Sequence, residues 1–118
     1  MAYDEGLAQR VRELFADRAG VSEKRMFGGL AFLLHGNMCV GVLKNNLMVR
    51  VGPYVYPDLV RQPHAREMDF TGRPMKGFLY VTPEGFEDDV NLRRWVGHAV
   101  AYASSLPRKG LRGSRGAA

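Results

Sequence analysis

The stretch MFGGLAFLLHGNMCVGVLKNNLMVRV, which runs from Met26 to Val51, decides the fold of this chain. It contains three short apolar runs separated by two turn signals, Gly36-Asn37 and Lys44-Asn45-Asn46. Short apolar runs that alternate with such turn residues are typical of antiparallel strands joined by tight turns. The stretch therefore predicts an antiparallel meander as the centre of the fold.

The third run of the meander alternates strictly, and this separates its two faces. Leu47, Val49 and Val51 alternate with Met48 and Arg50. Successive side chains of a strand point to opposite faces. Arg50 is therefore expected on the face opposite the three apolar residues.

The sequence before the meander predicts one helix and a polar segment. Asp4 can cap a helix that ends at Gly20, and Ser22 to Met26 forms either a polar link or an edge strand. The apolar positions of this helix follow the spacing of a single buried stripe and are Leu7, Val11, Leu14 and Phe15.

The sequence after the meander predicts a short helix, a second pair of strands and a long last helix. Tyr54 to Arg61 is expected to form the short helix, and Glu67 to Phe70 to pair with Met75 to Val81 across a turn. The last helix is expected to start near Glu87 and to lie across the sheet, with Trp95 as its apolar anchor.

Length and composition indicate one globular domain followed by a tail. The chain has 118 residues, of which 46% are apolar and 25% charged, close to the average for globular proteins. The domain is expected to span residues 1–107, with the last helix ending at Pro107. Residues 108–118 are expected to form a flexible basic tail.

The net charge of +5 is concentrated in this tail. Four of the 17 basic residues lie within the last eleven residues, and without them 13 basic residues face 12 acidic ones. A basic tail can bind nucleic-acid phosphates without sequence preference, or it can serve only as a solubilising end. Nucleic-acid binding is therefore a weak alternative function.

Cysteine use and hydropathy favour a cytoplasmic protein. Cys39 is the single cysteine, so no intramolecular disulfide can form, which is typical of a reducing compartment. Charged residues interrupt the N-terminal segment, and no apolar run reaches the roughly 18 residues that span a bilayer. We therefore expect a cytoplasmic location and no membrane partner.

The sequence contains no motif for catalysis, for a cofactor or for a metal ion. His35, His64 and His98 lack the spacing of metal ligands, and one cysteine cannot supply a thiolate shell for zinc. Cys39 is either a nucleophile assisted by His35 or an inert cysteine among apolar neighbours. We expect the protein not to be an enzyme.

Four cationic side chains flank or face the predicted sheet and form the candidate binding surface. They are Arg25, Arg50, Arg73 and Lys76. If they converge, they can hold an acidic peptide or a phosphate. The alternative is a set of separate, solvated cations.

Several separated strings of this sequence resemble the N-terminal domain of the TfoX/Sxy proteins. The strings are KRMFGG (Lys24 to Gly29), GNMC (Gly36 to Cys39), LMVRVG (Leu47 to Gly52), MDFTGRPMKGF (Met68 to Phe78), LRRWV (Leu92 to Val96) and SLP (Ser105 to Pro107). The resemblance extends from the first predicted helix to Pro107.

The resemblance implies an α+β fold in two layers, in which helices pack on a five-stranded antiparallel sheet similar to that of secretion chaperones. TfoX/Sxy proteins are regulators of natural competence that act with a cyclic-AMP-responsive transcription factor. Those regulators carry a second, C-terminal domain, and this sequence is expected to be a stand-alone N-terminal domain. The resemblance implies no catalytic residues.

Taken together, these observations predict a non-enzymatic, regulatory domain that binds another protein, with the transcription machinery as one candidate partner. A homodimer is also expected, because Leu30 to Leu34 and Phe78 to Val81 are apolar on both faces and a second subunit could cover them. The alternatives are nucleic-acid binding through the basic tail and a small-ligand site between the sheet and the last helix.

Overall fold

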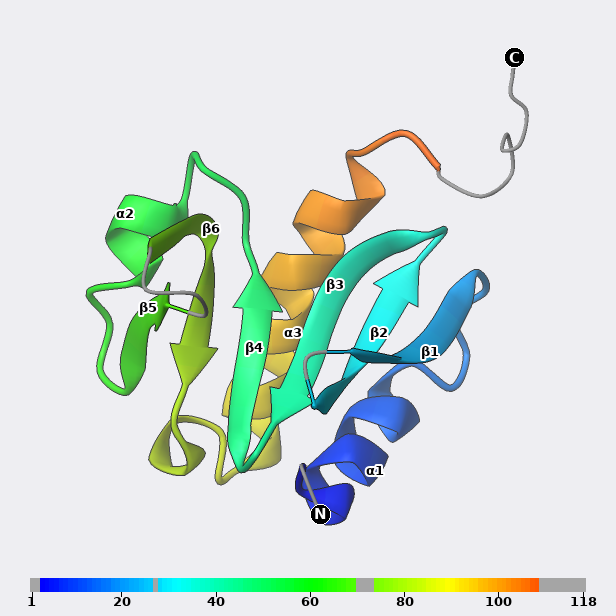
Figure 1. The fold of residues 1–118 in the computed structure, drawn as a ribbon, viewed down its shortest axis with the longest axis horizontal. Helices are drawn as coiled ribbons and strands as arrows, with labels where there is room; N and C mark the ends of the chain where they lie inside the picture. The colour runs from blue at the N-terminus through cyan, green and yellow to red at the C-terminus, as the bar shows by residue number, and fades with distance from the viewer. Residues whose placement is uncertain (1–2, 27, 70–73, 109–118) are drawn as a thin grey trace.

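The computed structural model describes residues 3–26, 28–69 and 74–108, and these form an α+β fold in two layers (Figure 1). The elements in chain order are α1 (Glu5–Leu14), β1 (Val21–Met26), β2 (Gly29–Leu34), β3 (Asn37–Leu43), β4 (Asn46–Arg50), α2 (Tyr56–Leu59), β5 (Ala65–Asp69), β6 (Pro74–Val81), the 3₁₀ turn η1 (Pro83–Gly85) and α3 (Asp89–Ser104). The strands form one sheet in the order β1-β2-β3-β4-β6-β5, and all neighbours are antiparallel.

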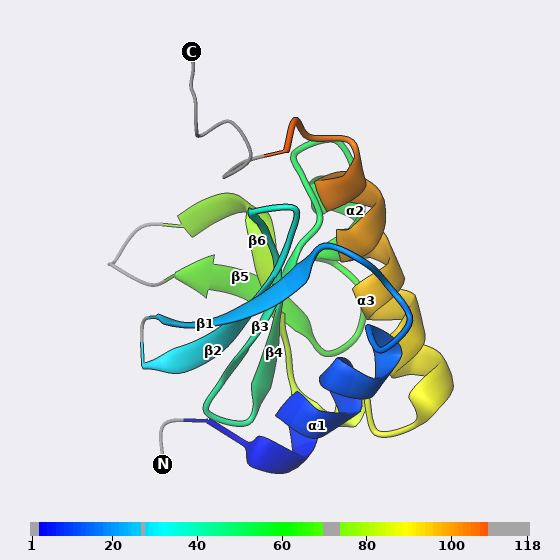
Figure 2. The same cartoon turned by 90° about the vertical axis from the view of Figure 1, so that its right-hand side faces the viewer.

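Helices cover one face of the sheet, as the side view shows (Figure 2). α3 packs across β2, β3 and β4, and α1 lies on the same side. Within the described residues, no helix lies on the opposite face. We call this second face the open face.

The core lies between the sheet and the helices. Alternate residues of the central strands point toward α3, and Phe32, Val40 and Val49 among them are at most 1% exposed. Trp95 of α3 is 1% exposed, which confirms it as the anchor of the last helix. Phe15, just after α1, stacks on Phe32 with ring centroids 5.8 Å apart. Each of these burials stabilises the fold by about 1.5–3 kcal/mol.

The predicted meander is confirmed as β2, β3 and β4. Its first turn consists of His35 and Gly36, which both have positive φ, so Asn37 begins β3 instead of forming the turn. Asn37 is 2% exposed, and its side-chain amide donates a hydrogen bond of 2.8 Å to the carbonyl oxygen of Pro107. This bond ties the meander to the segment that follows α3.

The caps of the two long helices use aspartate side chains. Asp4 accepts a hydrogen bond from the backbone N–H of Leu7 at 3.1 Å, which confirms the predicted cap of α1. Asp88 accepts one from the N–H of Asn91 at 2.8 Å, so α3 begins at Asp89, close to the predicted start.

Both long helices end earlier than the sequence predicts. α1 ends at Leu14 and not at Gly20, and α3 ends at Ser104 and not at Pro107. Beyond each end, backbone N–H groups bond to carbonyl groups three residues back, as Arg18 does to Phe15 and Ser105 to Tyr102. Such bonds close the helix with a tighter turn.

The sheet has six strands, one more than the five that the family resemblance implies. The additional strand is β1. For this segment the sequence allowed two interpretations, a polar link or an edge strand. Its four central side chains are exposed, so no hydrophobic alternation marks it. β1 forms by backbone pairing with β2, and Arg12 of α1 donates hydrogen bonds of 2.6 and 2.8 Å to its Glu23.

The predicted second pair of strands is confirmed as β5 and β6, and the predicted short helix as α2. β5 ends at Asp69, and the predicted strand residue Phe70 lies outside the described residues. Residues 109–118 of the predicted tail also lie outside them.

Candidate functional site

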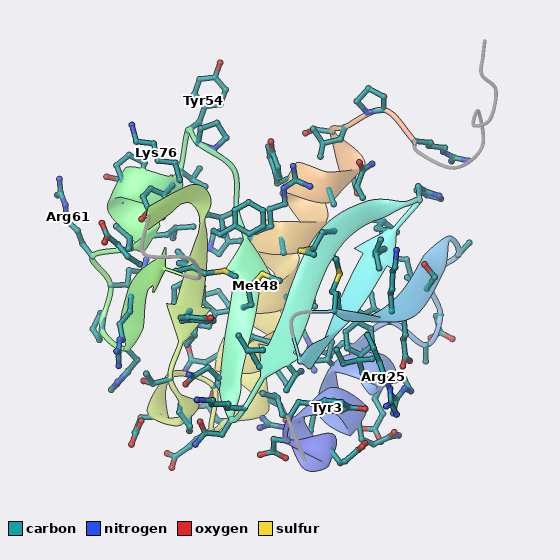
Figure 3. The ribbon with its side chains drawn as sticks, viewed as in Figure 1. Tyr3, Arg25, Met48, Tyr54, Arg61 and Lys76 are labelled. Carbon is teal, nitrogen blue, oxygen red and sulfur yellow. The ribbon has the colours of Figure 1, made fainter. Side chains whose placement is uncertain are left out.

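The open face consists of the strand residues that point away from the helices, as strand register and alternation place them. They are Ser22, Lys24, Met26, Gly29, Ala31, Leu33, Met38, Gly41, Leu43, Asn46, Met48, Arg50, Arg66, Met68, Phe78 and Tyr80. Figure 3 looks onto this face, with Met48 near its centre.

One row of the open face crosses every strand of the sheet in register. It runs through Lys24, Ala31, Gly41, Met48, Tyr80 and Arg66, and each residue pairs with the next one on the neighbouring strand. We call it the crossing row. Cations stand at its two ends, on the edge strands β1 and β5, and its middle is small or apolar.

Small residues in the middle of the crossing row make room for Met48. A Cβ atom on Gly41 would lie 2.9 Å from the Cε of Met48 and 3.2 Å from the backbone oxygen of Leu30. The Met48 side chain therefore lies against the backbone of β3, and it is only 5% exposed. A larger residue at position 41 would push this methionine off the sheet.

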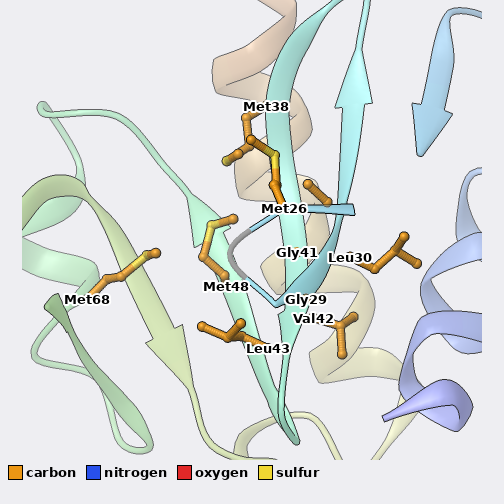
Figure 4. Close-up of a pocket in the computed structure, with 10 residues that line it drawn as sticks. Met26, Gly29, Leu30, Met38, Gly41, Val42, Leu43, Met48 and Met68 are labelled. Atoms are coloured by element: carbon orange, nitrogen blue, oxygen red, sulfur yellow. The ribbon is translucent and has the colours of Figure 1, made fainter. Parts of the chain in front are cut away.

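Four methionines cluster over the middle of the open face (Figure 4). They come from β1, β3, β4 and β5 and are Met26, Met38, Met48 and Met68. The pocket that they line encloses about 20 Å³, which is room for about one water molecule. The methionines therefore fill the hollow, and a larger ligand can enter only if they move.

The sequence predicts that both faces of the segment Leu30 to Leu34 are covered, and the methionine cluster covers the face of β2 that points away from the helices. Ala31 points to the open face, yet it is only 2% exposed. Leu33 on the same face is half-buried. The chain thus covers most of β2 by itself, and this burial does not require a second subunit.

The open face carries cations and, among its described residues, no carboxylate. Lys24 and Arg66 stand on its edge strands, and Arg50 lies at the end of β4. The glutamates of the edge strands pair with core residues and so point to the helix side, Glu23 beside Phe32 and Glu67 beside Leu79. The described side chains of this face therefore carry a net positive charge.

The four cations that the sequence singles out do not form one cluster. Arg25 pairs with Leu30, a core residue, so it lies on the helix side of β1. Lys76 is exposed and lies far from Arg25, on the other side of the molecule (Figure 3). Arg73 lies outside the described residues.

Arg50 is on the face that its alternation predicts, but it is held by aromatic rings. Its guanidinium carbon lies 5.4 Å from the ring centroid of Phe78 and 5.3 Å from that of Tyr102. A guanidinium between two rings gains cation–π energy and joins β4, β6 and α3. Arg50 therefore has a structural contact beside the crossing row, because it pairs with Phe78 and not with a residue of that row. The cations of the row itself are Lys24 and Arg66.

Sequence reasoning missed Lys24, Arg66 and the methionine cluster. Lys24 belongs to a strand that lacks hydrophobic alternation, and β5 has a register irregularity between Glu67 and Asp69. The available signal was that Met26, Met38, Met48 and Met68 each lie in a segment that the sequence predicts, or allows, to be a strand.

Cys39 is buried in the core and does not form a catalytic pair with His35. It lies on β3 at the irregularity in register between Phe32 and Leu33, and it is 0% exposed. Burial raises the pKa of the Cys39 thiol to about 12. His35 packs over Gly20, where an added Cβ would lie 2.2 Å from its ring, and no hydrogen bond joins it to Cys39.

One alternative from the sequence is a small-ligand site between the sheet and the last helix, and the structure has a depression there. It is lined in part by Gly52, Tyr54, His98 and Tyr102, and Tyr54 is 94% exposed. Cys39 is not among its lining residues. Burial and the nearby Arg94 lower the pKa of His98.

Within residues 3–26, 28–69 and 74–108, no group of three or more His, Cys, Asp or Glu side chains is placed to hold a metal ion. In the same part of the chain, no helix has the length and apolarity needed to cross a membrane.

The fold and the open face define a small α+β domain in which helices cover one face of the sheet and methionines cluster on the other. The model of one protein family, the TfoX N-terminal domain, matches residues 13–103. The chain therefore belongs to the TfoX N-terminal domain family. Comparisons with curated proteins and with solved structures gave no match.

The thiol of Cys39 is expected to be inert in the folded protein. A pKa of about 12, compared with the ordinary 9.0, lowers the thiolate fraction about a thousandfold at pH 8. Alkylation by iodoacetamide should therefore be at least about a hundredfold slower in native protein than in guanidinium-unfolded protein. Because the folded pKa is raised, stability should fall as the pH rises above about 9. Equal alkylation rates would contradict the burial.

Two of the described cations, Arg50 and Lys76, are expected to differ in their effect on stability. Arg50→Ala removes contacts with two rings and should lower the free energy of unfolding by about 1–2 kcal/mol. The matched Lys76→Ala change removes an exposed cation and should stay within about 0.5 kcal/mol. Urea denaturation measures both values. Equal losses would show that the Arg50 stacking contributes nothing.

Proposed function

We propose that this TfoX N-terminal domain is a non-enzymatic regulatory domain that binds another protein on its open face. The observation that carries the proposal is the crossing row, which is apolar in the middle, cationic at both ends and set in a face without described carboxylates. The middle of the row is itself buried, but half-buried apolar residues around it on the open face, Leu33, Met38 and Leu43, reach the surface. Exposed apolar patches rimmed by polar residues mark interaction sites on protein surfaces.

The methionine cluster supports protein binding in preference to catalysis or small-molecule binding. Methionine is unbranched and flexible, so a surface rich in it can reshape around an apolar partner. The pocket at this place is nearly filled in the free protein. The thiol of Cys39 is buried on the helix side, away from any ligand on the open face.

The family supports a regulatory setting for this binding. TfoX/Sxy regulators act with a transcription factor in competence, so the transcription machinery is the first class of partner to test. A single, buried, free cysteine fits a reducing compartment, and we place the protein in the cytoplasm. A second copy of the chain and a nucleic acid are the competing occupants of the open face.

The proposal is tested by affinity capture from a lysate of the native host, treated with nuclease, followed by binding of the purified partner. A Leu33→Glu and Met38→Glu double variant places two carboxylates on half-buried positions of the open face. We expect it to retain less than about a tenth of the partner, because burying an unpaired charge in an interface is strongly unfavourable.

The matched control is a Val90→Glu and Ala101→Glu double variant, which makes the same change at exposed positions of α3. It should retain the partner, and thermal melting should show that both variants are folded. Equal retention by both variants would refute the proposed surface. Capture of nucleic acid alone, or only of another copy of this chain, would refute a heterologous protein partner.

A further inference from the structure

We infer that the element that docks on the open face is an amphipathic α-helix, apolar in its middle and acidic at both ends. The inference rests on the proposed function and adds the chemistry of the partner. It follows from the charges, the length and the backbone of the crossing row.

The charges of the crossing row require acidic groups at both ends of the docked element. Lys24 stands on one edge strand and Arg66 on the other, and the residues between them are uncharged. Complementary charges at the rim of an interface set its specificity and register. A partner element with acidic ends and an apolar centre would place its acids beside Lys24 and Arg66 and its apolar side chains over the middle of the row.

The width of the sheet sets the length of that element. Lys24 and Arg66 are separated by five strand spacings, which amounts to about 24 Å. An α-helix covers this distance with about 16 residues. The acids are therefore expected in the first and last turns of a helix of about four turns.

The backbone of the sheet favours a helix over an extended peptide. In the middle of the open face, the backbone groups of β2, β3 and β4 are engaged with neighbouring strands. An extended peptide laid on these strands would leave its own N–H and C=O groups without partners, which costs free energy in an apolar site. A helix satisfies these groups internally, and flexible methionines can close around its side chains.

A second copy of this chain fits the open face poorly. Two such faces would bring the cations Lys24, Arg50 and Arg66 of each copy into one interface without a described carboxylate between them.

The inference is tested by selection from a display library of 16-residue peptides with randomised side chains. Peptides enriched on the wild-type protein should carry Asp or Glu in the first and last turns and apolar residues at helical spacing. A Lys24→Glu and Arg66→Glu double variant should instead enrich peptides with basic ends. The best acidic-ended peptide should bind this variant at least about tenfold more weakly.

The control is an Arg61→Glu and Arg93→Glu double variant, which makes the same charge change at exposed positions after α2 and on α3. It should bind the selected peptide within about twofold of wild type. Circular dichroism should show all three proteins folded and the peptide helical when bound.

Several outcomes would overturn the inference. They are enrichment of peptides without acidic ends, enrichment of extended peptides, no enrichment, and preferential binding of the open face to phosphatidylserine vesicles. If one of these occurs while Leu33→Glu and Met38→Glu still abolish protein capture, only the helix inference fails. If that capture is unaffected, the proposed function itself fails.

Discussion

The structure depends on the burial of one face of the β2–β4 meander under α3. Trp95 and Leu92 of α3 are 1% exposed and pack in the same core as Val40 and Val49 of the strands. This contact uses one face of the sheet. Helices therefore leave the other face of the central strands to be covered by other means.

The methionines are the means by which the chain covers that second face. Ala31 has a small side chain and Gly41 has none, so the middle of the sheet leaves room for Met48, which lies over Gly41 and is 5% exposed. Within the described residues, no helix covers this side of the sheet. The flexible methionine side chains fill the space instead. These methionines bury the apolar middle of the sheet in the unbound domain. Because they are flexible, they can rearrange around a partner at a smaller free-energy cost than a close-packed core. The same feature thus links stability to binding.

The sequence predicted the parts of this architecture that local patterns encode. The meander, the Asp4 cap, the Trp95 anchor and the face of Arg50 all follow from turn residues, capping chemistry or alternation, and the structure confirms them. Lys24 and Arg66 could not be placed on one row, because that needs the register of strands far apart in the chain and across two irregularities. Tyr102 was likewise unpredictable as a partner of Arg50, since the contact depends on where α3 crosses the sheet.

The most direct test of the central claim is site-specific photo-crosslinking in the native host, with a diazirine amino acid at position 38 or at position 90. Met38 lies on the open face, and Val90 is 70% exposed on α3. A defined protein should crosslink from position 38 and not from position 90, and the crosslinked peptide should lie in a helix with acidic ends. Crosslinks from position 90 alone, or none from position 38 in functional protein, would contradict it.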